Sequence, residues 1–292
     1  MRDLHLEIDN YLRERNLPFK RDAIHPFITK VFLPDNSSFS LFDDRWVCKR
    51  PLVEGVIASR SGSCETIFAR KCKIRHQEDG SLQLFKDFFN KYHFYGNAKA
   101  KYYIGLEYDN NLVAVASFSQ SRPLPRANSP LAEERVKNIP KEFNPVYMNL
   151  YSNSSIWNNS ENSQKELYDK IIIVDSYEWV RYASLPGVRV VGGMGRLLKE
   201  FERTVCREAE KTDGRPYEIM SYADLEFSGG ETYKRLGFIE AGTRQPVEFA
   251  VVADNYERFP VSKLKTDTKK EGVILYTFFN LGSLKYIKPY NI

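Results

Sequence analysis

The chain has 292 residues and a mass of 34.0 kDa, enough for one large domain or two modest ones. Its hydrophobic fraction of 42% and charged fraction of 28% exclude a disordered or collagen-like chain. The net charge is a mild +5, and no apolar run approaches the roughly 20 residues that span a membrane. Since residues 1–10 also lack the apolar stretch of a secretory signal, we expect a cytoplasmic protein with no membrane partner.

The first 65 residues are expected to form a small α+β extension. Apolar residues recur at helical spacing over residues 4–15, and Pro18 ends that helix. Short apolar runs separated by turn signals follow as far as Gly62. The first 75 residues carry 14 Lys and Arg against 10 Asp and Glu, with the tightest basic cluster at Arg70, Lys71, Lys73 and Arg75. A solvated surface is the simpler interpretation of this cluster, and contact with phosphates is the alternative.

The next segment predicts a helix and a hairpin. Residues 81–92 carry an apolar helical stripe, which directs a helix into the loop of residues 93–96. Two β-rich runs, residues 101–107 and 112–119, flank an Asp-Asn-Asn turn. Because Asn tolerates positive φ, this pattern is typical of a tight hairpin.

Residues 120–169 are polar, with five prolines and a run rich in Ser and Asn. This stretch is longer than ordinary connections, so we interpret it as an insertion that contains one short strand, residues 146–151, and can act as a lid.

The remaining segments alternate strands and helices. We expect strands at residues 170–183, 217–222, 238–252 and 272–279, a long helix at 192–209 and a short one at 231–236.

A glycine turn between a strand and the long helix carries the most information. Gly192, Gly193 and Gly195 stand where backbone N–H groups at a helix start converge on an anion. No Gly-Lys-Ser/Thr follows, which excludes a Walker loop, and the later glycine of the dinucleotide motif is missing. Tight packing of strand on helix is the alternative explanation for these glycines.

A second motif lies downstream, where Tyr233 is followed by Gly237 and Phe238. With the glycine turn before it, this order of elements resembles the acyl-coenzyme A binding half of the GNAT N-acyltransferase superfamily. The resemblance implies an α+β fold with a mixed, mainly antiparallel central sheet flanked by helices, over residues 66–292. It also implies that the glycine turn holds the pyrophosphate of an acyl-coenzyme A, such as acetyl-coenzyme A, through residues Val191, Gly192, Gly193, Gly195 and Arg196.

A closer resemblance covers residues 66–255, roughly two thirds of the chain. Its motifs are His93-x-x-Gly96, the hairpin, Glu178-x-x-Arg181, Val191-Gly192-Gly193 and Ser221-Tyr222-x-Asp224. They resemble a GNAT-like branch of phage and mobile-element proteins, which includes domains of homing endonucleases and is similar to Mom-type enzymes that modify adenine in DNA. This implies a nucleic acid base as acceptor, with DNA or another nucleic acid as partner.

Three residues are candidates for catalysis. Asp224, just past a strand end, can accept a proton or cap a turn, and Tyr233 can protonate a leaving sulfur or pack against Phe238. His93 can act as a base, contact the substrate, or bond to the backbone. Substrate-binding candidates are Glu178, Arg181, Ser221 and Tyr222. Because Glu178 and Arg181 are three apart, they face opposite ways on a regular strand unless a bulge intervenes.

The cysteines argue for free thiols and against a metal. Cys48, Cys64 and Cys72 lie with His76 within 29 residues, but the intervening gaps of fifteen, seven and three residues do not match the paired spacing of structural zinc sites. With Cys206 further on, the chain fits a reducing compartment, and we expect no metal.

The N-terminal extension also resembles the opening of restriction-like nuclease domains attached to the same branch. The strand that should carry Glu and Lys reads Ser37-Ser38-Phe39-Ser40-Leu41, so such a relic would not cut and would serve as a docking or DNA-contacting piece.

Two functions remain open from the sequence. The first is an acyltransferase acting on an amine, and the second is a non-catalytic GNAT scaffold that binds nucleic acid. The family has Gln or Arg where Val190 stands, which favours the second, whereas Asp224 and Tyr233 favour the first. The acyl group, the acceptor and the oligomeric state stay open.

Overall fold

The computed structural model describes residues 4–34, 36–127, 171–209, 216–264 and 274–290. Most of the proposed insertion, residues 128–169, therefore lies outside the described residues. The strand expected at residues 146–151 and the expected role as a lid fall in this part. Within the described ranges, no helix has both the length and the apolar character needed to cross a bilayer.

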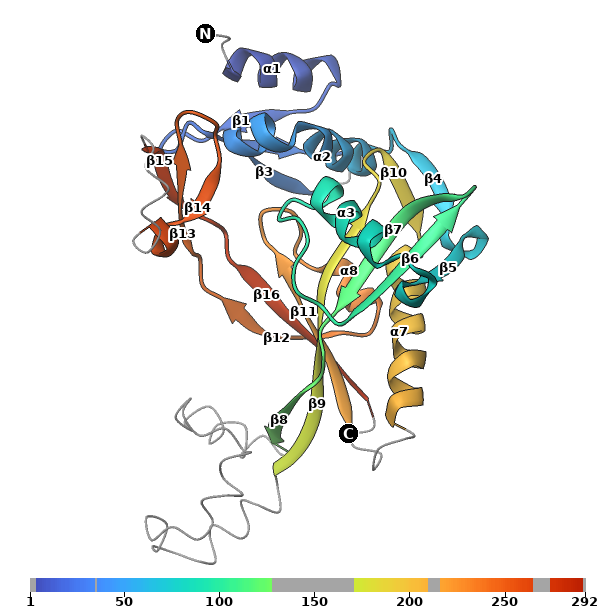
Figure 1. The fold of residues 1–292 in the computed structure, drawn as a ribbon. Coiled ribbons are helices and arrows are strands. Elements are labelled where there is room, and N and C mark those ends of the chain that lie inside the picture. The colour runs from blue at the N-terminus through green and yellow to red at the C-terminus, as the bar shows by residue number, and fades with distance from the viewer. Residues whose placement is uncertain (1–3, 35, 128–170, 210–215, 265–273, 291–292) are drawn as a thin grey trace, which may run out of the picture.

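An eight-stranded sheet forms the centre of the molecule (Figure 1). The strand order is β12-β16-β11-β9-β7-β6-β5, and β8 pairs with β9. The strands are β5 (Lys73–His76), β6 (Tyr102–Tyr108), β7 (Asn111–Phe118), β8 (Arg122–Ala127), β9 (Ile171–Ser184), β11 (Tyr217–Asp224), β12 (Ile239–Arg244) and β16 (Ser283–Tyr290). Every pair is antiparallel except β9 with β11.

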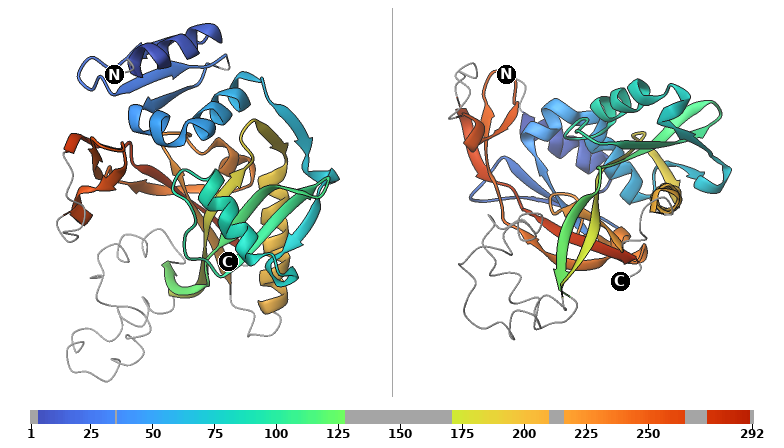
Figure 2. Two further views of the ribbon diagram at one scale, coloured as in Figure 1. Left: turned by 45° about the horizontal axis from the view of Figure 1, so that its top comes forward. Right: turned by 60° about the horizontal axis from the view of Figure 1, so that its bottom comes forward.

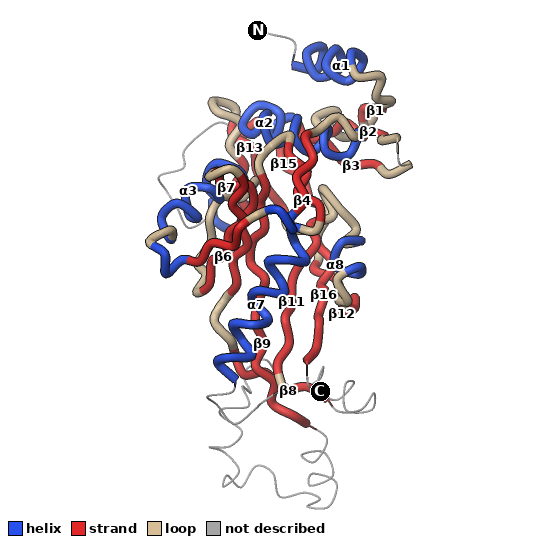
Figure 3. Tube along the Cα trace, turned by 90° about the vertical axis from the view of Figure 1, so that its right-hand side faces the viewer, coloured by secondary structure: helices blue, strands red, loops and turns tan. Residues whose placement is uncertain are grey.

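The parallel strands β9 and β11 of this sheet need a crossover connection. Helix α7 (Gly193–Ala209) lies in that connection. The expected fold class is confirmed: the chain is α+β, with a mixed, mainly antiparallel sheet flanked by helices. Figure 3 shows α7 on one side of the strands.

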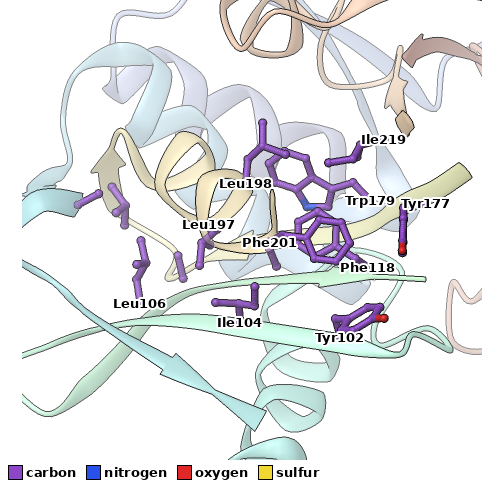
Figure 4. Packing of buried hydrophobic residues seen from close by; sticks show 14 of the residues in the cluster. Tyr102, Ile104, Leu106, Phe118, Tyr177, Trp179, Leu197, Leu198, Phe201 and Ile219 are labelled. Atoms are coloured by element: carbon purple, nitrogen blue, oxygen red, sulfur yellow. The ribbon is translucent and has the colours of Figure 1, made fainter. Parts of the chain in front are cut away.

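The two faces of the sheet are covered by different helices, because successive strand residues point to opposite faces. On β7, Ala114, Ala116 and Phe118 belong to the core under α7, and Phe118 stacks on Phe201 of α7 with ring centroids 3.8 Å apart (Figure 4). Val115 faces α3 (Leu82–Tyr92) instead. The expected helix and hairpin are thus confirmed, and Asp109 and Asn110 take φ of 47° and 61° in the turn.

The N-terminal segment has its own small core. Helices α1 (Leu4–Glu14) and α2 (Asp43–Ser61) pack with a three-stranded antiparallel sheet. The strands of that sheet are β1 (Phe19–Arg21), β2 (Ile28–Phe32) and β3 (Ser38–Phe42). The first helix was expected, but α2 was not, because Pro51 and Gly55 are helix breakers in sequence. The helix accommodates Pro51 by a kink at Lys49, where φ is −135°.

A C-terminal arm, residues 248–264 and 274–279, reaches back to this segment (Figure 2). It contains β13 (Glu248–Val252), β14 (Arg258–Pro260), α9 (Val261–Leu264) and β15 (Ile274–Phe279), with the strands in the order β14-β13-β15. Phe27 stacks on Tyr276 at 4.0 Å, and Phe42 contacts Phe278 at 4.8 Å. The expected strand 238–252 is therefore wrong as one element: its halves, β12 and β13, lie in different sheets.

The proposed boundary at residue 65 stays a prediction. There β4 (Glu65–Phe68) begins, and it pairs in parallel with β10 (Val188–Val191) rather than with the main sheet. The 3-10 turns η1 (Ala69–Lys71) and η2 (Gln77–Asp79) flank β5, and α8 (Glu231–Arg235) precedes β12.

Candidate active site

The parallel strands β9 and β11 separate part-way along their length. Their pairing runs from Asp175 and Tyr217 to Glu178 and Met220 and then stops. Beyond that point β9 continues along β7 and β11 continues along β16. The ends of the two strands therefore have different neighbours, and the start of α7 lies beside the end of β9, where Gly193 approaches the Tyr182 hydroxyl.

Ser221 joins the two strands where they separate. Its hydroxyl lies 3.0 Å from the carbonyl oxygen of Trp179 on β9 and 2.9 Å from the Tyr233 hydroxyl on α8. A serine hydroxyl has one proton and a carbonyl only accepts, so Tyr233 donates to Ser221, which donates to Trp179. The Tyr233 ring also packs edge-on against Phe238, with centroids 5.5 Å apart. Burial raises the pKa of Tyr233, so this phenol stays protonated.

The glycine turn leads directly into α7. Gly192 is exposed with a φ of 76°, and a Cβ there would meet only Ala69, at 3.9 Å. Gly193 is different, since a Cβ would lie 2.9 Å from the Tyr182 hydroxyl. A Cβ on Gly195 would lie 3.1 Å from Leu236. Gly193 and Gly195 thus have the packing role that was the alternative explanation, and Gly192 alone leaves open space.

Backbone N–H groups in the first turn of a helix have no acceptor within the helix, which applies here to residues 193–195. The first helical bond runs from the Arg196 N–H to the Gly192 carbonyl. The Arg196 guanidinium bonds to the Ala69 carbonyl and so fixes η1 against the helix, while Val191 is 38% exposed. The start of α7 therefore combines an exposed glycine with unpaired donors of the kind that hold phosphate oxygens.

His93, Tyr95 and Asp224 form one connected group, although 129 residues separate the last two. The Tyr95 hydroxyl donates to Asp224 Oδ2 at 2.8 Å, and the Tyr95 N–H donates to His93 Nδ1 at 3.1 Å. Asp224 Oδ1 accepts from the Glu226 N–H at 2.9 Å. Asp224 is therefore a turn cap and also reaches the loop of residues 93–96.

His93 is uncharged in this group. Burial, together with the positive charges of Arg181, Arg45 and Lys49, lowers the pKa of His93 to about 3. Because Nδ1 accepts a backbone bond, the proton of the neutral ring lies on Nε2. His93 in this tautomer is a hydrogen-bond donor toward a ligand rather than a base.

This assignment predicts a pH effect on stability. Between about pH 6.5 and pH 3 the unfolded chain protonates His93 while the native chain does not, so the free energy of unfolding should fall as the pH is lowered through this window. The substitution His93→Gln should flatten that part of the profile, as measured by urea unfolding at pH 6.5 and 5. An NMR titration placing the His93 midpoint near 6.5 would contradict the assignment.

A bulge places Glu178 and Arg181 on one face of β9, where Glu178 forms an ion pair with Arg122 of the neighbouring strand β8 at 3.4 Å. Ser117 pairs with Arg181 and Phe118 pairs with Trp179, so Val180 is the extra residue. The inserted residue puts both side chains on the same face, and the Glu178 charge reaches the Arg181 guanidinium. Arg181 also lies 6.0 Å from the Tyr95 ring centroid.

Tyr222 lies apart from Ser221, because neighbouring residues on β11 face opposite ways. Its ring lies 4.3 Å from the Arg244 guanidinium of β12. Asp224, two residues after Tyr222, points to the same face of β11 as Tyr222. Ser221 points to the opposite face, where it bonds to Tyr233. The candidates thus fall into two groups on opposite faces of β11.

The structure adds an ion-pair network that the sequence analysis missed. Arg258 on the arm donates two bonds to Asp44 of α2, at 2.7 and 2.9 Å, and two to Glu226, at 2.8 and 3.0 Å. Asp44 and Arg258 are 214 residues apart. Each acidic residue stands in an ordinary sequence context, so no local signal reveals the network.

The cysteines considered as zinc ligands lie on separate elements: Cys48 is exposed on α2, Cys64 precedes β4, and Cys72 is buried beside η1. Among the described residues, no three His, Cys, Asp or Glu side chains come together as a metal site.

Comparison with known proteins gives likenesses to solved structures. Polyamine N-acetyltransferase of Drosophila melanogaster, which catalyses the formation of N-acetylagmatine, is 11% identical with a TM-score of 0.34, covering 75% of this chain and 100% of its own. An agmatine N-acetyltransferase variant in its apo form is 10% identical with a TM-score of 0.31 and the same coverage. AtaT complexed with acetyl-methionyl-tRNAfMet is 15% identical with a TM-score of 0.32, covering 67% of this chain and 98% of its own.

With identities of 15% or less and TM-scores below 0.5, these likenesses carry no argument about this chain. No protein-family model matches the chain, and a search of curated proteins finds no match.

Proposed function

We propose that this protein is a GNAT-like N-acyltransferase that moves an acyl group from an acyl-coenzyme A to an amine. The observation that carries the proposal is the division of β9 from β11 after Glu178 and Met220, beside a helix that begins at an exposed glycine. The connected group of His93, Tyr95 and Asp224 supports it, because it offers a proton acceptor and donors at the end of β11, beyond the point where the two strands separate.

The residues at the start of α7 fit the diphosphate of coenzyme A. Gly192 presents its backbone without a side chain in the way, and the N–H groups of Gly193, Met194 and Gly195 would bind the oxygens, aided by the helix dipole. Val191 and Arg196 flank this turn. When bound, an acyl-coenzyme A would supply an activated acyl carbon, whose C–S bond breaks as the C–N bond to the amine forms.

Asp224 would take the proton that the amine loses. Each of its oxygens accepts one bond, and a carboxylate oxygen can accept more than one, so a lone pair remains for an ammonium or amine N–H. Tyr95 would orient this carboxylate. His93, through Nε2–H, would hold an acceptor oxygen or the acyl oxygen rather than act as the base.

Tyr233 would return a proton to the departing thiol. Its phenol is protonated, and Ser221 is its acceptor at 2.9 Å. Donation to a sulfur therefore requires Tyr233 to exchange that bond for one to the thiolate. Glu178 and Arg181, at the bulge of β9, would contact the acceptor together with Tyr222, whereas Ser221, on the other face of β11, would position Tyr233.

We further propose that the acceptor amine belongs to a nucleobase in DNA. This part of the proposal rests on the resemblance to Mom-type proteins. If DNA is the partner, phosphate contacts should make its affinity fall steeply with salt. Unchanged affinity between 50 and 200 mM salt would instead favour a small amine as acceptor.

The transfer itself is tested by incubating the protein with acetyl-coenzyme A and a panel of amines. The panel contains polyamines, amino acids, free nucleobases and single- and double-stranded oligonucleotides. Thiol release that depends on one acceptor, with a matching mass increase of that acceptor, would support the proposal. Release that no acceptor stimulates, or no release with any of them, would contradict it for the acetyl group and this panel.

A further inference from the structure

A cavity of about 550 Å³ lies where three parts of the chain meet. We call it the joint cavity. Its walls come from α2, from the loop after α3 and from the C-terminal arm, through residues that include Arg45, Lys49, Tyr95, Tyr256, Arg258 and Lys263. The volume is within the range of small-molecule sites. The walls belong to segments distant in sequence, so the cavity exists only in the folded chain.

Arg45 is buried in the cavity wall, and two of its guanidinium nitrogens have no hydrogen-bond acceptor. The residue is 7% exposed, and its Nε and Nη2 have no hydrogen-bond partner. The nearest carboxylate, Glu226, lies 3.8 Å from Nε and is already bound twice by Arg258. Donors left unpaired in a buried guanidinium cost free energy. Both nitrogens are shielded from solvent and the guanidinium lies 4.6 Å from the Tyr95 ring centroid, so Arg45 would turn toward the cavity for an anion to remove that cost.

The charges around the cavity favour an anion. Its lining includes four basic side chains, from Arg45, Lys49, Arg258 and Lys263, against the two acidic ones of Asp44 and Glu257. Asp44 accepts bonds from Nε and Nη2 of Arg258, while Glu257 is exposed to solvent. The low pKa of His93, attributed in part to Arg45 and Lys49, reflects the same positive field.

The cavity is also fixed in shape and larger than a simple ion. The ion pairs of Arg258 hold the arm against α2 and the turn after β11, which fixes the position of the cavity walls. Lys49, also in the lining, lies at the kink of α2 before Pro51. Phe94, Tyr95 and Phe249 add aromatic surface to the lining. An occupant would therefore have an apolar or planar body in addition to its charge.

We propose that the joint cavity binds a small organic anion, whose phosphate or carboxylate group is held by the Arg45 guanidinium and Lys49 while a planar body lies against the aromatic wall. A guanidinium presents a fork that matches both kinds of anion. The cavity shares Tyr95 with the candidate active site, but anion binding needs no acyl transfer, so a binding test without coenzyme A distinguishes this proposal from the proposed function.

The test is a calorimetric titration without any coenzyme A. The probes are adenosine monophosphate and phenylacetate, each with its neutral counterpart, adenosine and phenylacetamide, and inorganic phosphate alone. At least one of the two organic anions should bind saturably, and its neutral counterpart should bind about tenfold more weakly or not at all. The first probe pair reports a phosphate site and the second a carboxylate site.

Two variants locate the binding. Arg45→Gln should weaken the anion about tenfold or more, whereas Arg13→Gln, with a side chain 61% exposed on α1, should leave affinity unchanged. If Arg45→Gln fails to unfold cooperatively, Arg45→Lys and Lys49→Gln provide the comparison, and each should weaken binding. Absence of binding by both organic anions, equal binding of the neutral counterparts, or full affinity in all Arg45 and Lys49 variants that fold would overturn the proposal.

Discussion

Replacing Arg258 by methionine should lower the free energy of unfolding by about 3–5 kcal/mol, because it removes the cation from a buried ion pair and leaves the anions behind. The Arg258 side chain is 5% exposed, and those of Asp44 and Glu226 are 3% and 0% exposed. Burial already raises the pKa of Glu226 against the opposing charge of Arg258. Without that charge, both carboxylates would have to bind protons or admit water.

Urea denaturation measures this effect, with Arg203→Met on the exposed side of α7 as the matched control. The Arg203 side chain is 55% exposed, so its loss should change stability by about 0.5 kcal/mol or less. The double variant Arg258→Met, Asp44→Asn should recover part of the loss, since Asp44 then carries no charge and Glu226 still has the Arg45 guanidinium 3.8 Å away. A single variant as stable as the wild type would show that the network does not join the arm to α2.

The substitution Asp224→Asn should lower the acyl-transfer rate about 10²- to 10⁴-fold, since a positioned general base contributes an effect of that size. The amide keeps the shape of the side chain, and its oxygen can still accept one of the two bonds made by Tyr95 and the Glu226 N–H. Affinity for coenzyme A should stay the same, because Asp224 lies at the end of β11 and not on the turn at Gly192. The rate is measured in quenched, fixed-time assays in which the acylated product is quantified by mass spectrometry.

Tyr95→Phe is the companion variant. It removes the hydroxyl that donates to Asp224 at 2.8 Å but keeps the carboxylate, so its loss of rate should be smaller than that of Asp224→Asn. A rate for Asp224→Asn within a factor of three of the wild type would mean that the carboxylate only caps the turn after β11. The proton would then leave the amine by another route.

Local patterns were enough to predict the elements that surround the candidate site. The Asp109-Asn110 turn, the glycine start of α7 and the short helix with Tyr233 each depend on neighbouring residues, and each is where the sequence indicates. The bulge at Val180 was an open alternative. It now explains how Glu178 and Arg181 share a face.

Long-range pairing explains what the sequence did not reveal. Strand β16 comes after the last strand we expected, yet it lies inside the main sheet between β11 and β12. Its partners are about 40 to 75 residues earlier in the chain, and its side chains alone do not identify them. The same holds for Arg45 and Arg258, whose significance comes from partners on other elements.

The central claim is that the start of α7 holds the diphosphate of coenzyme A, and a calorimetric titration of coenzyme A into wild-type, Gly192→Ala and Gly187→Ala protein tests it most directly. Both glycines have positive φ, of 76° and 74°, and neither would place a Cβ closer than 3.9 Å to another atom, so the two variants carry a similar backbone strain. The account predicts saturable binding that Gly187→Ala preserves and Gly192→Ala weakens about tenfold. No binding by the wild type at millimolar coenzyme A, or equal affinity in all three proteins, would contradict it.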